Sequence, residues 1–142
     1  MEQNLFPPSD NFIKELANRQ GLAYTVGKQG LDRFYADNGK PIYPPNDGFV
    51  GNPKIETLTK NYIIDRYGRE TGSFVAPKGT TYTERSLPKG SASKDYRVYK
   101  IKKDIELVLS GRTAAWFGES GGGWQYKLPD TISNLTDYLE EV

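Results

Sequence analysis

The residues best suited to bind an anion lie in one short stretch, residues 64–88. Arg66 and Arg85 stand near glycines, whose small size lets backbone amides approach a ligand closely. Because a guanidinium group can bind two phosphate oxygens at once, Arg66 and Arg85 together could hold a pyrophosphate. Their spacing is equally compatible with surface ion pairs to neighbouring carboxylates, namely Asp65, Glu70 or Glu84.

A second candidate is Gln125, which follows the glycine-rich segment 118–123. A carboxamide donates and accepts hydrogen bonds, so it suits the hydroxyl groups of a sugar. The segment lacks the Gly-Lys-Ser/Thr of a P-loop and the βαβ setting of a dinucleotide fingerprint. It is also typical of a hairpin connection without a ligand. The nearby aromatic residues are equally typical of packing: Trp116, Trp124 and Tyr126.

The missing residue types narrow the possible chemistry. The chain has no cysteine and no histidine, which excludes thiolate nucleophiles, Cys/His zinc sites, Ser-His-Asp triads and imidazole bases. Catalysis must therefore use carboxylates, amides, hydroxyls, basic side chains or aromatic rings, and we predict no metal ligands in the site.

Charge is distributed unevenly along the chain, although the net charge is only +1. Residues 54–103 hold 12 Lys/Arg against 5 Asp/Glu, whereas residues 104–142 hold 2 against 7. A basic middle third favours binding of anions such as phosphates, although it could also merely solvate exposed strands. The overall balance lacks the basic excess of nucleic-acid-binding proteins, so we predict no nucleic-acid partner.

The elements that must position these residues fit one domain, because 142 residues are too few for two useful cores. No run approaches 18 apolar residues, and no basic segment precedes an apolar run at the N-terminus. We therefore expect neither a membrane span nor a secretory signal peptide in this sequence. Residues 9–20 predict an amphipathic helix capped by Ser9 or Asp10. The following stretch to about residue 60 predicts an ordered, turn-rich loop.

The second half of the chain predicts a sheet. Short strands are expected at 62–65, 73–75, 96–101, 105–109, 113–117 and 124–126, and the runs from 96 to 117 suggest an antiparallel meander. Leu135, Tyr138, Leu139 and Val142 follow Ser133 at helical spacing. The predicted fold class is α+β: a small single domain with a twisted antiparallel sheet core, an N-terminal helix and a short C-terminal helix.

Four segments, in this order, resemble the TNT domain family, which is named for the tuberculosis necrotizing toxin and includes fungal surface NAD glycohydrolases. The segments are YPPNDGFVG (43–51), IDRYGRETGSFVAPKGTTYTERSLP (64–88), YRVYKIKKDIELVLSGRTAAWFGESGGGWQY (96–126) and ISNLTDYLEEV (132–142). The resemblance implies a TNT-like domain over 43–142, with 1–42 as an N-terminal helix and lead-in segment packed into the same domain.

The resemblance also implies roles for individual residues. Arg66, in the D-R-Y-G segment, would line an NAD pocket, and Arg85, before S-L-P, would contact the phosphates. Phe74 would contact the nicotinamide side, and Gln125 would be the residue most tied to catalysis. Gln125 and Arg66 are thus the predicted catalytic residues. The predicted substrate-binding residues are Arg85, Phe74, Ser73, Gly72 and Trp124.

The implied activity is hydrolysis of the nicotinamide–ribose bond of NAD⁺ or NADP⁺, with no cofactor besides that substrate. The mycobacterial toxin of the family places a histidine near its site, and this chain has none. Nicotinamide leaves as a neutral base, so no general acid is required. An ADP-ribosyltransferase and a non-catalytic nucleotide-binding module remain alternatives. The resemblance further implies a secreted effector acting in the cytoplasm of a target cell, the C-terminal domain of a longer toxin, and a cognate immunity protein.

Overall fold

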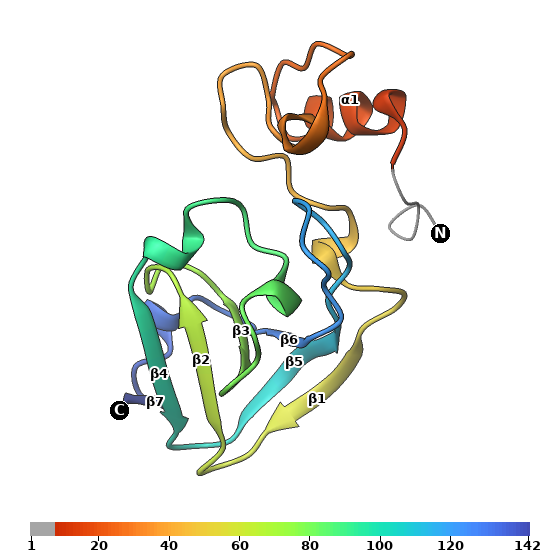
Figure 1. The fold of residues 1–142 in the computed structure, drawn as a ribbon. Helices are drawn as coiled ribbons and strands as arrows, with labels where there is room; N and C mark the ends of the chain where they lie inside the picture. The colour runs from red at the N-terminus through yellow and green to blue at the C-terminus, as the bar shows by residue number, and fades with distance from the viewer. Residues whose placement is uncertain (1–7) are drawn as a thin grey trace.

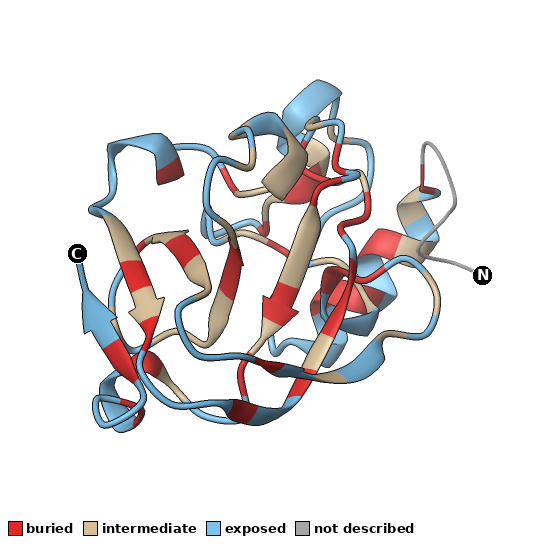
Figure 2. Cartoon of the chain, turned by 90° about the horizontal axis from the view of Figure 1, so that it is seen from below, coloured by how far each residue is buried: buried red, intermediate tan, exposed pale blue. Residues whose placement is uncertain are grey.

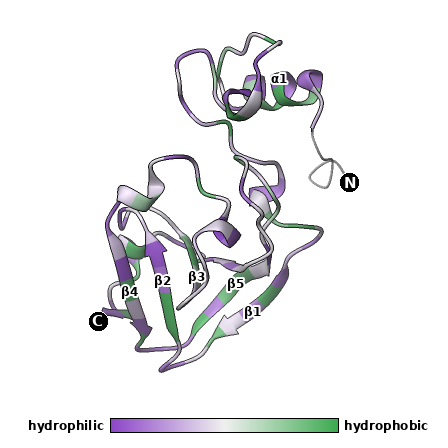
Figure 3. Cartoon of the chain, viewed as in Figure 1, coloured by the Kyte–Doolittle hydropathy of each residue, from purple (hydrophilic) through white to green (hydrophobic). Residues whose placement is uncertain are grey.

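A curled antiparallel sheet and one α-helix make up the computed structural model, which describes residues 8–142 (Figure 1). Within these residues the strand order is β1-β5-β6-β3-β2-β4-β7. The strands are β1 (Lys54–Leu58), β2 (Ile63–Tyr67), β3 (Phe74–Pro77), β4 (Tyr96–Ile101), β5 (Ile105–Arg112), β6 (Trp124–Lys127) and β7 (Leu139–Glu141). Strand β2 begins with hydrophobic residues and continues with hydrophilic ones (Figure 3).

The predicted N-terminal helix is confirmed as α1 (Asp10–Arg19). The Ser9 hydroxyl caps it by accepting a hydrogen bond from the Phe12 amide at 3.1 Å. Its apolar face is buried and consists of Ile13, Leu16 and Ala17. Short 3₁₀ turns connect the other elements: η2 (Gly30–Phe34), η3 (Asn46–Gly48), η4 (Thr83–Arg85), η5 (Ser91–Ser93) and η6 (Ile132–Asn134).

Two clusters of buried side chains hold the described chain together (Figure 2). One lies on the sheet, and the other joins α1 and the loops after it to Trp116 and Phe117, which follow β5. The Trp116 indole also donates a hydrogen bond to the Ile42 carbonyl at 2.8 Å. The N-terminal segment is therefore packed against the later chain, while the domain boundary at residues 42 and 43 stays a prediction.

The predicted meander is wrong. Strand β4 pairs with β2 and β7, whereas β5 pairs with β1 and β6, so β4 and β5 lie in different parts of the sheet. Residues 113–117 form isolated bridges instead of a strand. Their aromatic side chains belong to the second core, and this burial overrides their strand propensity.

The predicted C-terminal helix is also wrong, because the tail forms η6 and then β7. Leu135 and Leu139 are both buried in the sheet core, and a spacing of four residues fits a turn followed by a strand as well as a helix. Strand β7 pairs along the free side of β4, and Glu141 lies 3.1 Å from Arg97 in an ion pair. A ten-residue tail is too short to be stable as a helix without such packing.

Strand β1 lies inside the stretch that was predicted as loop. It is an edge strand, and of its residues only Leu58 is buried. Its sequence therefore lacks the alternation of apolar and polar residues that indicates a strand. Within residues 8–142, no helix combines the length and the apolar composition needed to cross a membrane.

Candidate functional site

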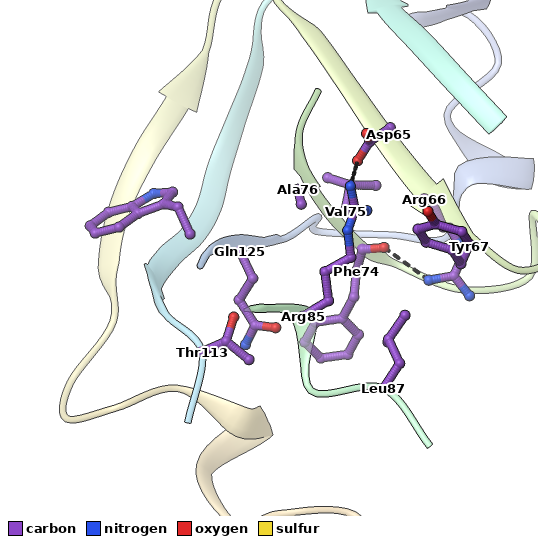
Figure 4. A pocket seen from close by; sticks show the side chains of 11 residues that line it. Asp65, Arg66, Tyr67, Phe74, Val75, Ala76, Arg85, Leu87, Thr113 and Gln125 are labelled. Carbon is purple, nitrogen blue, oxygen red and sulfur yellow. Dashed lines mark hydrogen bonds and ion pairs between the residues drawn. The ribbon is translucent and has the colours of Figure 1, made fainter. Parts of the chain in front are cut away.

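A cavity of about 390 Å³ opens where loop residues 43–48 face β2, β3 and the segment from η4 to η5. A recess of about 50 Å³ continues it toward the sheet, and the two share Arg66, Phe74, Arg85 and Gln125 among their lining residues. The larger volume lies within the range of about 300–1,000 Å³ that is typical of small-ligand sites. Four of the predicted site residues, distant in sequence, therefore meet at one cavity (Figure 4).

Arg66 presents an uncompensated cation to this cavity. Its Nε donates to the Arg69 carbonyl at 2.9 Å, and its Nη1 donates to the Phe74 carbonyl at 2.8 Å. Among residues 8–142, no carboxylate lies within ion-pair distance of Arg66. Burial lowers the pKa of its guanidinium, which nevertheless stays charged at neutral pH. A fixed, partly desolvated cation without a counter-ion favours an anionic ligand.

Arg85 is held differently, by a buried ion pair with Asp65. Its Nη2 lies 2.7 Å from Asp65 Oδ1, and the two side chains are 7% and 0% exposed. The guanidinium also donates to the Thr80 carbonyl and stacks over the Tyr67 ring at 5.0 Å. Of the two possibilities left open by the sequence, the ion pair is therefore present, although it is buried and the guanidinium still lines the cavity.

Two further hydrogen bonds fix the side chain of Asp65. Its Oδ2 accepts a hydrogen bond from the Tyr96 hydroxyl at 2.6 Å and from the Gly79 amide at 3.1 Å. Burial, followed by this hydrogen bond to Asp65, raises the pKa of Tyr96 to about 12. The Arg85 side chain is thus fixed before any ligand arrives.

Gly72 and Ser73 line neither cavity. Gly72 instead lies against the Arg66 guanidinium, where a Cβ atom would fall 1.9 Å from Nη2. A side chain at this position would displace Arg66 from its two carbonyl partners. The structure therefore gives Gly72 an indirect relation to the cavity, and direct substrate contact by Gly72 or Ser73 stays a prediction.

Gln125 lies on β6, and in Figure 4 it is on the opposite side of the Phe74 ring from Arg66. Its Nε2 donates to the Asp47 carbonyl at 3.0 Å, and no donor within the described chain reaches Oε1. In Figure 4, Oε1 lies on the side of the Phe74 ring. A fixed carbonyl oxygen in this position can accept a hydrogen bond from a sugar hydroxyl or from water.

The aromatic residues divide between the two parts of the site. Phe74 lines both the cavity and the recess, and the Lys127 ammonium lies 5.8 Å from its ring centre. Trp124 lines only the recess, and the Arg112 guanidinium covers its ring at 5.3 Å. Phe74 is therefore the aromatic residue better placed to contact a planar ligand.

The glycine-rich segment connects the element that carries Arg85 to the strand that carries Gln125. The Gly121 and Gly123 amides donate to the carbonyls of Thr83 and Glu84, at 3.2 Å each. A Cβ atom on Gly123 would lie 2.9 Å from the Glu84 carbonyl oxygen, so only glycine permits this approach. The segment thus fixes η4, which carries Arg85, next to β6, which carries Gln125.

Sequence reasoning missed the wall that faces Gln125. Tyr43, Pro44, Asp47 and Gly48 line the cavity, as do Thr113 and Lys94. The signal was available in the order Pro-Pro-Asn-Asp-Gly, because Asn, Asp and Gly accept the left-handed backbone of a tight turn. No group of acidic side chains suited to hold a metal ion occurs in the described residues.

Comparison with known proteins identifies the family. A family model described as "Tuberculosis necrotizing toxin" matches residues 57–142. A conidial surface nicotinamide adenine dinucleotide glycohydrolase from Aspergillus fumigatus is 34% identical over 130 residues, which cover 79% of this chain. The chain belongs to the TNT family. It spans about half of the fungal relative, whose matched part is 55% of its length.

Solved structures share the TNT fold. The tuberculosis necrotizing toxin complexed with its immunity factor IFT superposes with a TM-score of 0.63 at 17% identity, covering 92% of this chain and 82% of the toxin. Rhs1-CT in complex with its cognate immunity protein RhsI1 has a TM-score of 0.52 at 20% identity, and the match covers 70% of this chain and 83% of Rhs1-CT. At these identities the likeness establishes the fold.

Proposed function

We propose that this TNT domain is an NAD⁺ glycohydrolase toxin that cleaves the nicotinamide–ribose bond of NAD⁺, or NADP⁺, to give nicotinamide and ADP-ribose. The observation that carries the proposal is the meeting of uncompensated Arg66 and fixed Gln125 at one cavity. Family membership and the name of the fungal relative support it.

The arrangement suits the chemistry of this bond. When the C1′–N bond breaks, its electron pair neutralises the pyridinium nitrogen, so nicotinamide leaves without a proton. Positive charge then develops on the ribose, and water adds at C1′. Arg66 and the outer edge of Arg85 would hold the diphosphate, Phe74 would pack against nicotinamide, and Gln125 Oε1 would orient the ribose or the water.

The direct test is to incubate the purified chain with NAD⁺ and separate the products by chromatography. The proposal expects equal amounts of nicotinamide and ADP-ribose, without cyclic ADP-ribose. A labelled NAD⁺ analogue distinguishes the alternatives, because covalent label on a macromolecule would indicate a transferase. Intact NAD⁺ after hours of incubation would indicate a binding module and contradict the proposal.

We further propose that the domain acts as a secreted effector in the cytoplasm of a target cell and is neutralised by a cognate immunity protein. Both structural neighbours described above were solved in complex with an immunity factor or immunity protein. Expression of the chain in bacteria should stop growth and lower cellular NAD⁺. Co-expression with the small protein encoded beside it should restore both. Normal growth without any partner would contradict this proposal.

A further inference from the structure

The backbone of η3 is left-handed at the edge of the cavity. Asn46 and Asp47 adopt positive φ angles of 58° and 53°, a conformation that Asn and Asp accept more readily than other residues with a Cβ. The Asn46 carboxamide holds this turn by donating to the Phe49 carbonyl at 3.0 Å and to the Gly51 carbonyl at 2.6 Å. These two hydrogen bonds fix the turn and with it the position of Asp47.

The η3 turn directs two groups of Asp47 toward β6. The carbonyl accepts from Gln125 Nε2 at 3.0 Å, and carboxylate Oδ2 lies 3.0 Å from Lys127 Nζ in an ion pair. Gln125 and Lys127 are two residues apart on one strand, so their side chains lie on the same face of the sheet. Lys127 also faces the Phe74 ring, which places the Asp47 carboxylate at the same end of the cavity as Gln125 and Phe74.

The two carboxylates that line the cavity differ in their exposure and in their bonding partners. Within the described chain, Asp47 and Asp65 are the acidic residues among the lining residues. Asp65 is fully buried, forms an ion pair with Arg85 and accepts hydrogen bonds from Tyr96 and the Gly79 amide. The Asp47 side chain is 49% exposed, and Lys127 is its one ion-pair partner in the described residues. The other acids considered from the sequence do not line the cavity: Glu70, Glu84 and Glu119.

We propose that Asp47 is a catalytic carboxylate of the glycohydrolase reaction. As the C1′–N bond breaks and nicotinamide departs with the electron pair, a water oxygen bonds to C1′. Asp47 accepts the proton that this water loses and later releases it to solvent. Its carbonyl meanwhile holds the Gln125 carboxamide in place. Because the chain has no histidine, this carboxylate takes the place of the imidazole that most often acts as a general base in enzymes. The inference rests on the proposed function.

The test is the Asp47→Asn variant, which keeps the backbone carbonyl that binds Gln125. Asparagine tolerates positive φ well, so the turn should be preserved, and the unfolding midpoint in urea should stay close to that of the wild-type chain. We expect kcat for NAD⁺ to fall by about 100-fold while KM changes little, since a general base acts in the transition state. Asp137→Asn is the matched control, because Asp137 is exposed and lines neither cavity.

Chemical rescue separates a base from a structural carboxylate. Azide is an anionic nucleophile that has no proton to lose, so it should bypass Asp47. We expect azide to raise the rate of nicotinamide release by Asp47→Asn at least tenfold and to yield ADP-ribosyl azide. A wild-type kcat in the variant, or a folded, inactive variant that azide does not accelerate, would overturn the role of Asp47. If the wild-type chain leaves NAD⁺ intact, the proposed function itself fails instead.

Discussion

The two ends of the cavity are built by opposite means. At one end, Arg66, Arg85 and Asp65 combine two cations and one anion, so a single positive charge remains for the ligand. At the other end, the neutral carboxamide of Gln125 is oriented by the carbonyl of a left-handed turn. The first end relies on charge that burial strengthens, and the second relies on geometry that the backbone imposes.

Under the proposed function, we expect the two ends to have separate tasks. An excess positive charge attracts a diphosphate in the ground state and in the transition state alike, so it contributes mainly to binding. A fixed acceptor next to the reacting carbon matters most when charge develops there, so it contributes mainly to turnover. Perturbing each end alone should therefore change different measured quantities.

The largest expected effect is on stability, at the arginine end. Asp65→Ala leaves Arg85 buried without its counter-charge and should lower the free energy of unfolding by about 3–5 kcal/mol, measured by urea denaturation. Replacing both partners, Asp65→Ala with Arg85→Met, should restore part of that loss. A single variant as stable as the wild-type chain would show that the ion pair is not desolvated in solution.

Arg66 should affect binding next most strongly. Arg66→Ala removes a charged donor from the proposed diphosphate site and should raise KM for NAD⁺ by about 10–100-fold, as measured from initial rates. Arg66→Lys should recover little, because an ammonium group cannot replace the guanidinium that spans the Arg69 and Phe74 carbonyls. An unchanged KM in both variants would remove Arg66 from the binding site.

A smaller effect concerns pH at the same end. The pKa of Tyr96 is raised from 10 to about 12, so its contribution to stability is fully present below pH 10 and is lost as the pH rises toward 12. Unfolding measurements between pH 9 and 12 should show a loss of stability that is smaller in Tyr96→Phe. Identical pH profiles for both chains would mean that the hydroxyl does not donate to Asp65.

The smallest effect is expected at the exposed rim. Lys94 lines the cavity but is exposed, so Lys94→Ala should raise KM for NAD⁺ by no more than about fivefold at low salt. High ionic strength should remove the difference, because exposed charges are screened. A large effect that persists at high salt would place Lys94 in direct contact with the substrate.

The sequence was most informative where local chemistry decides the structure. Ser9 and the apolar spacing after it predicted α1 correctly, and the motifs around Arg66, Arg85 and Gln125 predicted residues that meet at one cavity. The first signal depends on helix capping, and the second depends on the resemblance to the TNT family.

The remaining errors arose where distant partners decide. The spacing of Leu135 and Leu139 fits a helix, but the tail instead pairs with β4 as strand β7. Residues 113–117 have strand propensity, but their aromatic side chains are buried in the second core. The role of Asp65 as the partner of Arg85 depends on burial, which spacing alone does not reveal. The wall around Asp47 was missed because its turn residues also suit an ordinary surface loop.

The central claim is that one end of the cavity binds NAD⁺ and the other acts on it, and Gln125→Ala tests this most directly. Calorimetric titration and product analysis should be performed on the same preparation. The account expects Kd for NAD⁺ to stay within about threefold of the wild-type value while kcat falls by about 10²–10³-fold. Wild-type turnover in Gln125→Ala, or a loss of binding as large as the loss of turnover, would contradict it.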